Sequence, residues 1–330
     1  MKQGFDDRNR DLIVNVDGEL THRDEAGVSP FDSVVQGGDG VWEGLRLYDG
    51  RIFRLLPHLD RLRDSAKALA FDTVPSHETI IHELRRTLDA NDMRDGVHIR
   101  LTLTRGEKIT SGMDPRLNQS GPTLIVLPEY KTPVYDKSGL SFVTSSIRRF
   151  PPDGLDPKIH HNNLLQSVLA KIEANHAGAD AALMLDRNGF IAEGHGTHVF
   201  VVEGETVVTG TTKACPEGIT RQTVLDLCAA NDIDHAVRDL SVTEAYRADE
   251  MFCTGTMGEP ALWTWTAHGD RTTSSWRGDA WPRDTPTRYP ALCSRPNSSG
   301  GDLSLSGREA GIGDNSSRLR QPSRPRLLFP

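Results

Sequence analysis

Short runs of alternating hydrophobic and polar residues are separated, in the first part of the chain, by two longer stretches with a helical period. The alternation predicts strands that end at Asp-Gly turn pairs or at polar residues, over residues 12–16, 41–48 and 97–103. Apolar residues that recur every three or four positions predict two amphipathic helices, one from residue 57 and one after Ser76, a favourable N-cap. A strand over 124–127 would complete this first unit.

A similar succession of strand and helix patterns continues to about residue 254. A strand over 140–146 is followed by a helical stripe that begins at Asn163 and by a strand over 181–186. The pair Asn188-Gly189 is the strongest hairpin signal in the chain. A helix is expected from about Thr220. Mixed elements of this kind are typical of an α+β protein.

The expected domain boundaries lie where these patterns stop. Residues 128–138 combine two prolines with mixed charge, which is typical of an interdomain linker. We therefore expect a small N-terminal domain over 1–127 and a second domain over 139–260. Periodicity then fades and Ser, Arg, Gly and Pro dominate, so residues 261–330 form an atypical tail.

Two explanations fit this tail. It is either a disordered segment or the product of a frameshift that replaced the natural C-terminus. Trp263-Thr264-Trp265-Thr266 must be encoded TGG-ACN-TGG-ACN, and another frame of these bases spells Asp, then Val, Leu or Met, then Asp. If the natural C-terminus is needed to finish the core, a frameshift would leave a nonfunctional product. Resequencing the gene tests this hypothesis, which a clean read across codon 260 would refute.

Composition narrows the class of function. A net charge of -8 argues against general nucleic-acid binding, which usually requires a basic patch. The chain has no apolar run near the roughly 20 residues of a membrane helix and no apolar core of a signal peptide at its start. The four cysteines form neither a CxxC pair nor a zinc spacing, and His160-His161 lacks a third ligand at a clear spacing, so we expect no metal site. A cytoplasmic protein that acts on small molecules fits best.

Several short motifs occur in one order along the chain: Gly38-Asp39-Gly40-Val41-Trp42-Glu43, Glu43-Gly44-Leu45-Arg46, His58-Leu59-Asp60-Arg61-Leu62, Ala192-Glu193-Gly194-His195-Gly196-Thr197, Gly218-Ile219-Thr220-Arg221 and Gly255-Thr256. Their order and spacing resemble those of the class IV aminotransferases, from about residue 12 to 259. The resemblance implies an α+β fold with a smaller N-terminal α/β sandwich and a larger, barrel-like C-terminal domain. It also implies a homodimer that uses pyridoxal 5′-phosphate (PLP).

The resemblance assigns cofactor-binding roles to particular residues. Arg61 would grip the PLP phosphate, Glu193 would meet the pyridinium nitrogen, and the remaining phosphate contacts would come from Gly218, Ile219, Thr220 and Thr256. Elementary physics agrees with two of these assignments. Gly218-Ile219-Thr220 lies where a helix begins, and free N–H groups there attract an anion. Glu193 ends an apolar strand, where a buried carboxylate needs a cationic partner.

The catalytic lysine departs from the family pattern. An ungapped match of the helix that begins at Asn163 with D-amino acid transaminases puts His160 at the lysine position. Lys158 lies two residues earlier, and side chains at i and i+2 of a strand share a face, so Lys158 is our candidate for the Schiff base and the proton shuttle. Lys171 and Lys213 do not match the family position.

The resemblance also suggests the substrate. Arg100 matches a branched-chain arginine, Arg105 matches an arginine that D-amino acid transaminases direct toward the substrate carboxylate, and Trp42 would line an apolar pocket. We expect transamination between a branched-chain or similar apolar amino acid and a 2-oxo acid such as 2-oxoglutarate.

The alternatives are a D-amino acid transaminase, an aminodeoxychorismate lyase-like enzyme, and a PLP-binding pseudoenzyme that lacks a Schiff-base lysine. Two departures from the family, His198 in place of asparagine and Leu164 in place of tyrosine in an Asn-Tyr pair, bear on the cofactor contacts.

Overall fold

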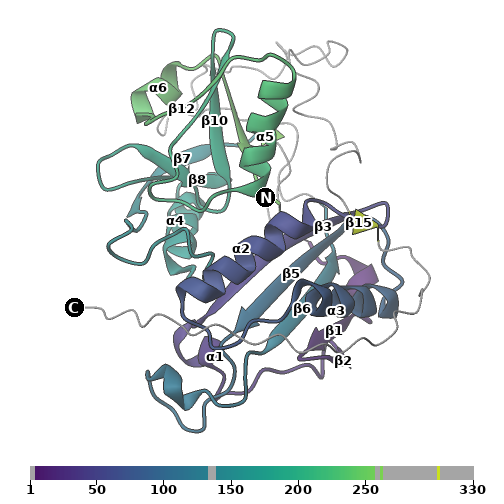
Figure 1. Cartoon of the computed structure of the whole chain (residues 1–330). Helices are drawn as coiled ribbons and strands as arrows, with labels where there is room; N and C mark the ends of the chain where they lie inside the picture. Colours follow the sequence, from purple (N-terminus) through teal and green to yellow (C-terminus); the bar gives the residue numbers. More distant parts are fainter. Residues whose placement is uncertain (1–3, 133–138, 257–260, 263–302, 305–330) are drawn as a thin grey trace, which may run out of the picture.

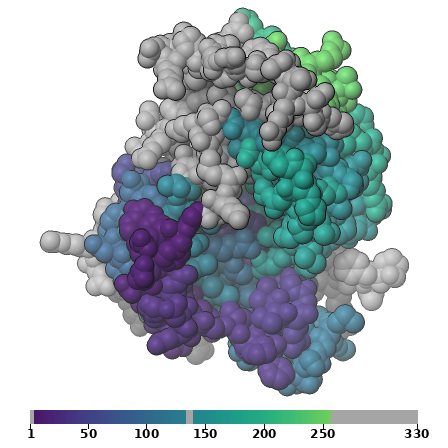
Figure 2. All heavy atoms as spheres, turned by 180° about the vertical axis from the view of Figure 1, so that it is seen from behind, coloured from purple at the N-terminus to yellow at the C-terminus, as the bar shows by residue number. Residues whose placement is uncertain are grey.

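The computed structural model describes residues 4–132, 139–256, 261–262 and 303–304, which form two domains that lie against each other (Figures 1 and 2). The first domain is purple to blue in Figure 1, and the second is teal to green. The fold is α+β, as expected from the sequence. Among the described residues, no helix is both long and apolar enough to cross a bilayer.

The first domain is built on an antiparallel sheet. Its strand order is β15-β4-β3-β5-β6-β1-β2. The strands are β1 (Ile13–Val16), β2 (Glu19–His22), β3 (Gly40–Tyr48), β4 (Arg51–Ile52), β5 (Val97–Thr104), β6 (Leu124–Tyr130) and β15 (Leu303–Ser304). The longest pairing joins β3 to β5, with Gly40 opposite Thr104 and Leu47 opposite Val97. This pairing fixes which β3 side chains face the second domain.

Two helices cover one face of this sheet (Figure 1): α2 (Leu55–Ala68) and α3 (His77–Ala90). Ser76 caps α3 by accepting a hydrogen bond from the Thr79 amide, as its sequence position predicts. Leu59, Leu62 and Leu84 are fully buried between the helices and the sheet. The short helix α1 (Ser33–Gly37) precedes β3.

The second domain contains two sheets around a shared core. One has the order β7-β8-β9 and the other β12-β11-β10-β13-β14. The strands are β7 (Phe142–Arg148), β8 (Ala181–Leu185), β9 (Ile191–Gly194), β10 (His198–Glu203), β11 (Thr206–Thr209), β12 (His235–Val237), β13 (Glu250–Thr254) and β14 (Ala261–Leu262). Leu183 from one sheet and Val201 and Met251 from the other belong to one hydrophobic cluster, as a barrel-like arrangement requires.

Three helices flank these sheets: α4 (Leu165–His176), α5 (Ile219–Ala230) and α6 (Val242–Arg247). The apolar stripe expected along α4 is largely exposed, with Leu165 74% and Val168 49% accessible. Ala170 and Ala174 are the buried residues of this helix instead. Small side chains allow the helix backbone to lie close to β7 and β8, and this close approach explains why the larger residues face outward.

Described strands extend past the expected domain boundary and occur within the expected tail. Strand β6 continues to Tyr130, so residue 128 still pairs in the sheet, opposite Ile99. Within the tail, β14 pairs with β13 and β15 pairs with the edge strand β4. The codons proposed for a frameshift correspond to residues 263–266, which lie outside the described residues.

Candidate active site

A cavity of about 330 Å³ is lined by residues of both domains. The first domain contributes β3, α2 and β5 through Trp42, Arg61 and Arg100. The second domain contributes the turn before α4, the end of β9, the start of α5 and the residues after β13. Those residues include His160, Glu193, Gly218, Ile219, Thr220 and Thr256. Almost every residue that the sequence suggested for cofactor binding therefore borders one space.

A fully buried carboxylate, Glu43, lies behind this cavity. Arg61 donates to both of its oxygens, from Nε and Nη2, each at 2.7 Å. The Nδ1 atoms of His58 and His160 lie 2.6 and 3.2 Å from the same carboxylate. Burial, the largest influence, opposes ionisation, but the charge of Arg61 and the hydrogen bonds from Arg61 and His160 outweigh it and hold the pKa of Glu43 well below its ordinary value. Glu43 is therefore an ionised acceptor that orients three neighbours.

Arg61 also joins the two domains. Its Nη1 donates to the backbone carbonyl of Glu217, in the loop before α5, at 2.7 Å. Since Nε and Nη2 contact Glu43, part of the positive charge expected to grip a phosphate is already balanced within the protein.

Glu193 lines the cavity from the end of β9. Its side chain is buried, and Oε1 lies 2.8 Å from Nη2 of Arg149. Burial raises the pKa of Glu193 to about 7, although Arg149 and Arg61 act in the opposite direction. A cationic ring nitrogen next to this carboxylate would stabilise its ionised form.

The N-terminus of α5 forms another wall. Its N-cap is Gly218, which offers no side-chain cap, so the first-turn amides are available to a ligand. A Cβ at Gly218 would overlap the ring of His198, and only glycine fits this approach. The hydroxyls of Thr197 and Thr254 are buried without a partner among the described residues. Helix-end amides are well suited to an anion such as a phosphate.

Lys158 and His160, the two candidates for the family's lysine position, border different spaces. The rule that residues i and i+2 share a face requires a strand at Lys158 and His160, but the structure has a turn there, in which Asp156 accepts from the amide of Lys158 at 3.0 Å. The Lys158 side chain is half exposed, and its Nζ lies 3.4 Å from Oε1 of Glu217. It borders a neighbouring crevice instead of the cavity, although Arg61 and Gly218 line both spaces.

His160, in contrast, faces the cavity. Its backbone is held by the hydroxyl of Ser65 and by the amide of Trp42, and its ring stacks on Trp42 with centroids 4.3 Å apart. Burial, followed by the charge of Arg61, lowers the pKa of His160, so the neutral imidazole is favoured.

Comparison with known proteins agrees with this geometry. The family model described as amino-transferase class IV matches residues 40–260. The chain is a class IV aminotransferase family member. It is 53% identical over 252 residues to branched-chain-amino-acid aminotransferase-like protein 2 of Arabidopsis thaliana, a match that covers 76% of this chain and 45% of that protein. The chain therefore spans about half the length of that relative.

Two further similarities cover most of both chains. A putative branched-chain-amino-acid aminotransferase of Methanocaldococcus jannaschii is 40% identical over 249 residues, with 75% of this chain and 85% of that protein covered. Among solved structures, the branched-chain amino acid aminotransferase from Thermobaculum terrenum in its PLP form matches with a TM-score of 0.69. It is 26% identical, and the match covers 77% of this chain and 85% of that one.

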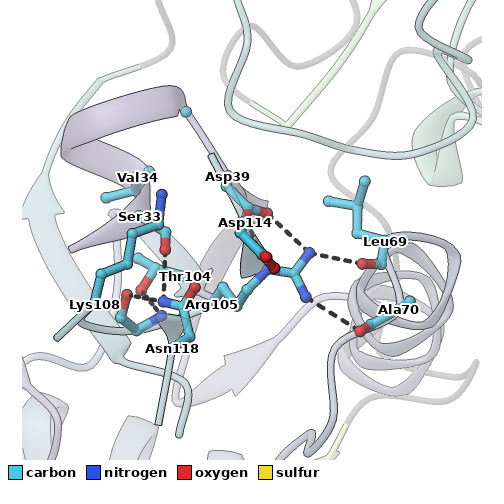
Figure 3. A network of polar contacts seen from close by, with 12 residues as sticks. Ser33, Val34, Asp39, Leu69, Ala70, Thr104, Arg105, Lys108, Asp114 and Asn118 are labelled. Atoms are coloured by element: carbon cyan, nitrogen blue, oxygen red, sulfur yellow. Dashed lines mark hydrogen bonds and ion pairs between the residues drawn. The ribbon is translucent and has the colours of Figure 1, made fainter. Parts of the chain in front are cut away.

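In this class IV family member, the two candidate substrate arginines have different surroundings. The Arg100 guanidinium lies 3.5 Å from the centre of the Trp42 ring and donates to Asn162 at 2.8 Å, at the wall of the cavity. Arg105 lies outside the cavity lining. It donates to Asp39 and to the carbonyls of Leu69 and Ala70 at the end of α2 (Figure 3). Arg105 therefore links Asp39, just before β3, to the C-terminal end of α2.

The sequence did not identify every residue of the site. Arg149, which pairs with Glu193, follows strand β7 without any periodic or motif signal. The partnerless hydroxyls of Thr197 and Thr254 could be recognised only from their burial. Lys171 and Lys213 do not line the cavity. Lys171 donates to the carbonyl of Asp180, and Lys213 pairs with Asp239. The described residues contain no cluster of three or more potential metal-binding His, Cys, Asp or Glu side chains.

Proposed function

We propose that this chain is a PLP-dependent aminotransferase of the branched-chain type. It would move an amino group between an apolar amino acid and a 2-oxo acid such as 2-oxoglutarate. The observation that carries the proposal is that one cavity brings together a buried carboxylate, the open N-terminus of a helix and a Trp–Arg pair. PLP, when bound, supplies an electron-accepting ring for breakage of the substrate Cα–H bond.

The residues present fit the ring and the phosphate of this cofactor. Glu193 would hold a protonated ring nitrogen, and that cation would offset the cost of burying the carboxylate. The amides of Ile219 and Thr220, with the hydroxyl of Thr256, would donate to the phosphate. Arg61 would add positive charge at the same end. To receive the cofactor, Arg61 would change partner and Glu193 would share its carboxylate between Arg149 and the ring nitrogen.

The substrate side of the cavity favours an apolar side chain with a carboxylate. Trp42 and Leu164 provide apolar surface, and Arg100 provides a cation beside Trp42. Arg105 is already paired with Asp39, so the contact that would favour a D-amino acid is less accessible. We propose a branched-chain-like substrate on this basis. Assembly as a homodimer and a cytoplasmic location stay predictions.

Lys158 is the proposed source of the catalytic amine, and its role requires movement. The turn at 156–159 would have to open so that Nζ leaves Glu217 and enters the cavity. A second function is favoured by the observed direction of His160: the chain would bind PLP without a covalent link and would act as a PLP-binding pseudoenzyme.

Borohydride reduction followed by peptide mapping distinguishes these functions. The protein is incubated with PLP and reduced, and mass spectrometry locates any modified lysine. Modification of Lys158, lost in Lys158→Ala and retained in Lys213→Ala, would support the covalent aminotransferase. Bound PLP without a modified lysine would support the second function. Failure to bind PLP at all would refute both. Transfer from leucine to 2-oxoglutarate, measured as glutamate formed, then tests the proposed substrates.

A further inference from the structure

The part of the cavity wall that His160 forms has a defined hydrogen-bonding polarity. Nδ1 of His160 lies 3.2 Å from the buried carboxylate of Glu43, which can only accept while it is ionised. Nδ1 must therefore carry the proton. Because the neutral ring has only one N–H, Nε2 is an acceptor. No partner of Nε2 is found within the described residues, and the ring borders the cavity.

The surroundings keep the ring in this state and orientation. Trp42 stacks on one face of the imidazole, and both backbone polar groups of His160 are hydrogen-bonded to the first domain. Glu43 is in turn held by Arg61 and His58. The ring therefore cannot rotate to present an N–H to the cavity without losing its contact with Glu43.

This inference rests on the second function proposed above, the binding of a vitamin B6 phosphate without a covalent link. In such a ligand the ring nitrogen and the reactive substituent are at opposite positions of the ring. If the nitrogen meets Glu193 and the phosphate meets the start of α5, the substituent points away from Glu193. Trp42 and His160 form part of the wall of the same cavity, and we place the substituent against that part of the wall. An acceptor at that wall suits an N–H donor and repels the oxygen of an aldehyde.

We propose that His160, positioned by Glu43, contacts the reactive substituent of the bound ligand and makes this pocket selective for the amine form, pyridoxamine 5′-phosphate, over the aldehyde form. The pocket holds the amine form without a covalent bond. The side chain of Lys158, paired with Glu217, takes no part in this contact.

Binding measurements on the full chain test the proposal. Isothermal titration with pyridoxamine 5′-phosphate and with PLP should give a dissociation constant about tenfold lower for the amine form, the expected worth of one satisfied hydrogen bond. Equal constants, or tighter binding of PLP, would overturn the proposal. Borohydride labelling of Lys158 would also overturn it, while leaving the covalent aminotransferase function intact. Binding of neither ligand would mean that the proposed function itself has failed.

Variants at position 160 separate a ligand contact from a structural role. His160→Phe keeps an aromatic ring next to Trp42 but removes the acceptor, so the preference for the amine form should disappear. His160→Gln can donate to Glu43 through its amide nitrogen and accept through its oxygen, so it should retain part of the preference. His160→Lys should become reducible by borohydride at residue 160. Retention of the full preference in His160→Phe would refute the assignment.

His176→Phe, at an exposed position in the last turn of α4, is the matched control and should bind both ligands as the wild type does. A thermal melt of each variant confirms that it is folded. If His160→Phe does not fold, the preference in His160→Gln and the labelling of His160→Lys still decide the outcome.

Discussion

Replacement of Glu43 by glutamine removes one charge from a fully buried network and leaves the geometry of its neighbours nearly unchanged. The carboxylate accepts two hydrogen bonds from Arg61 and contacts His58 and His160. A glutamine amide can replace one acceptor, but its NH₂ group then faces an Arg61 donor. The substitution therefore leaves a largely buried guanidinium, whose side chain is 16% exposed, without a counter-charge.

The expected cost follows from that burial. Loss of one partner of a buried ion pair typically lowers the free energy of unfolding by about 3–5 kcal/mol. For a chain of this size each kcal/mol shifts the melting midpoint by about 2–4 °C, so the midpoint of Glu43→Gln should fall by about 6–20 °C. Urea unfolding, followed by tryptophan fluorescence, measures the free energy directly. Asp114→Asn, which removes an exposed pair with Arg116, is the control and should leave the midpoint unchanged.

The pH dependence gives this prediction a second measurement. The folded-state pKa of Glu43 lies well below its ordinary 4.5, so its contribution is fully present above pH 4.5 and is lost as the pH falls toward the folded-state pKa. The stability difference between wild type and Glu43→Gln should be constant from about pH 6 to 8 and should shrink below about pH 4.5. A difference below about 1 kcal/mol at neutral pH would mean that the cost of burying the charge cancels the ion pair, and the reasoning would fail.

Three other predictions concern the cavity and its surroundings. Because burial raises the pKa of Glu193 to about 7 from 4.5, the ligand-free wild type should lose stability as the pH rises from 4.5 through 7, and Glu193→Gln should remove that component in melts across this range. Gly218→Ala should weaken PLP binding at least tenfold in equilibrium dialysis, because its Cβ would meet the His198 ring; the double variant with His198→Ala should restore part of the affinity. Arg105→Ala should lower the free energy of unfolding by about 1–3 kcal/mol without changing PLP affinity, whereas Arg100→Ala should raise the KM for the amino acid; a large loss of PLP affinity in Arg105→Ala would contradict its placement outside the cavity.

The sequence was most informative where local rules decide the structure. Ser76 caps α3, the Asn188-Gly189 turn joins β8 to β9, and α5 begins at Ile219, one residue from the expected Thr220. The hydrophobic period alone could not predict which face of α4 is buried, because the helix packs through two alanines and exposes its larger residues. Tertiary packing overrides the periodic signal there.

For the site too, the sequence predicted some features and not others. Motif order identified Arg61, Glu193 and Gly218, which border the cavity. It could not predict that Arg61 is shared with Glu43, because the two motifs that contain Glu43 do not show which side chain this residue contacts across β3 and α2. The direction of Lys158 was also beyond the sequence, because the Asp156 turn replaces the strand on which the two-residue rule depended.

The contacts of Arg61 have a thermodynamic consequence for the relative motion of the domains. Its guanidinium supplies a hydrogen bond across the interface, to the Glu217 carbonyl, and borders the space proposed for an anion. Any ligand that draws this group away from Glu217 must also weaken the contact between the domains by the same coupling energy. Occupancy of the cavity would then make the contact between the domains looser, so limited proteolysis should be faster with inorganic phosphate than without it.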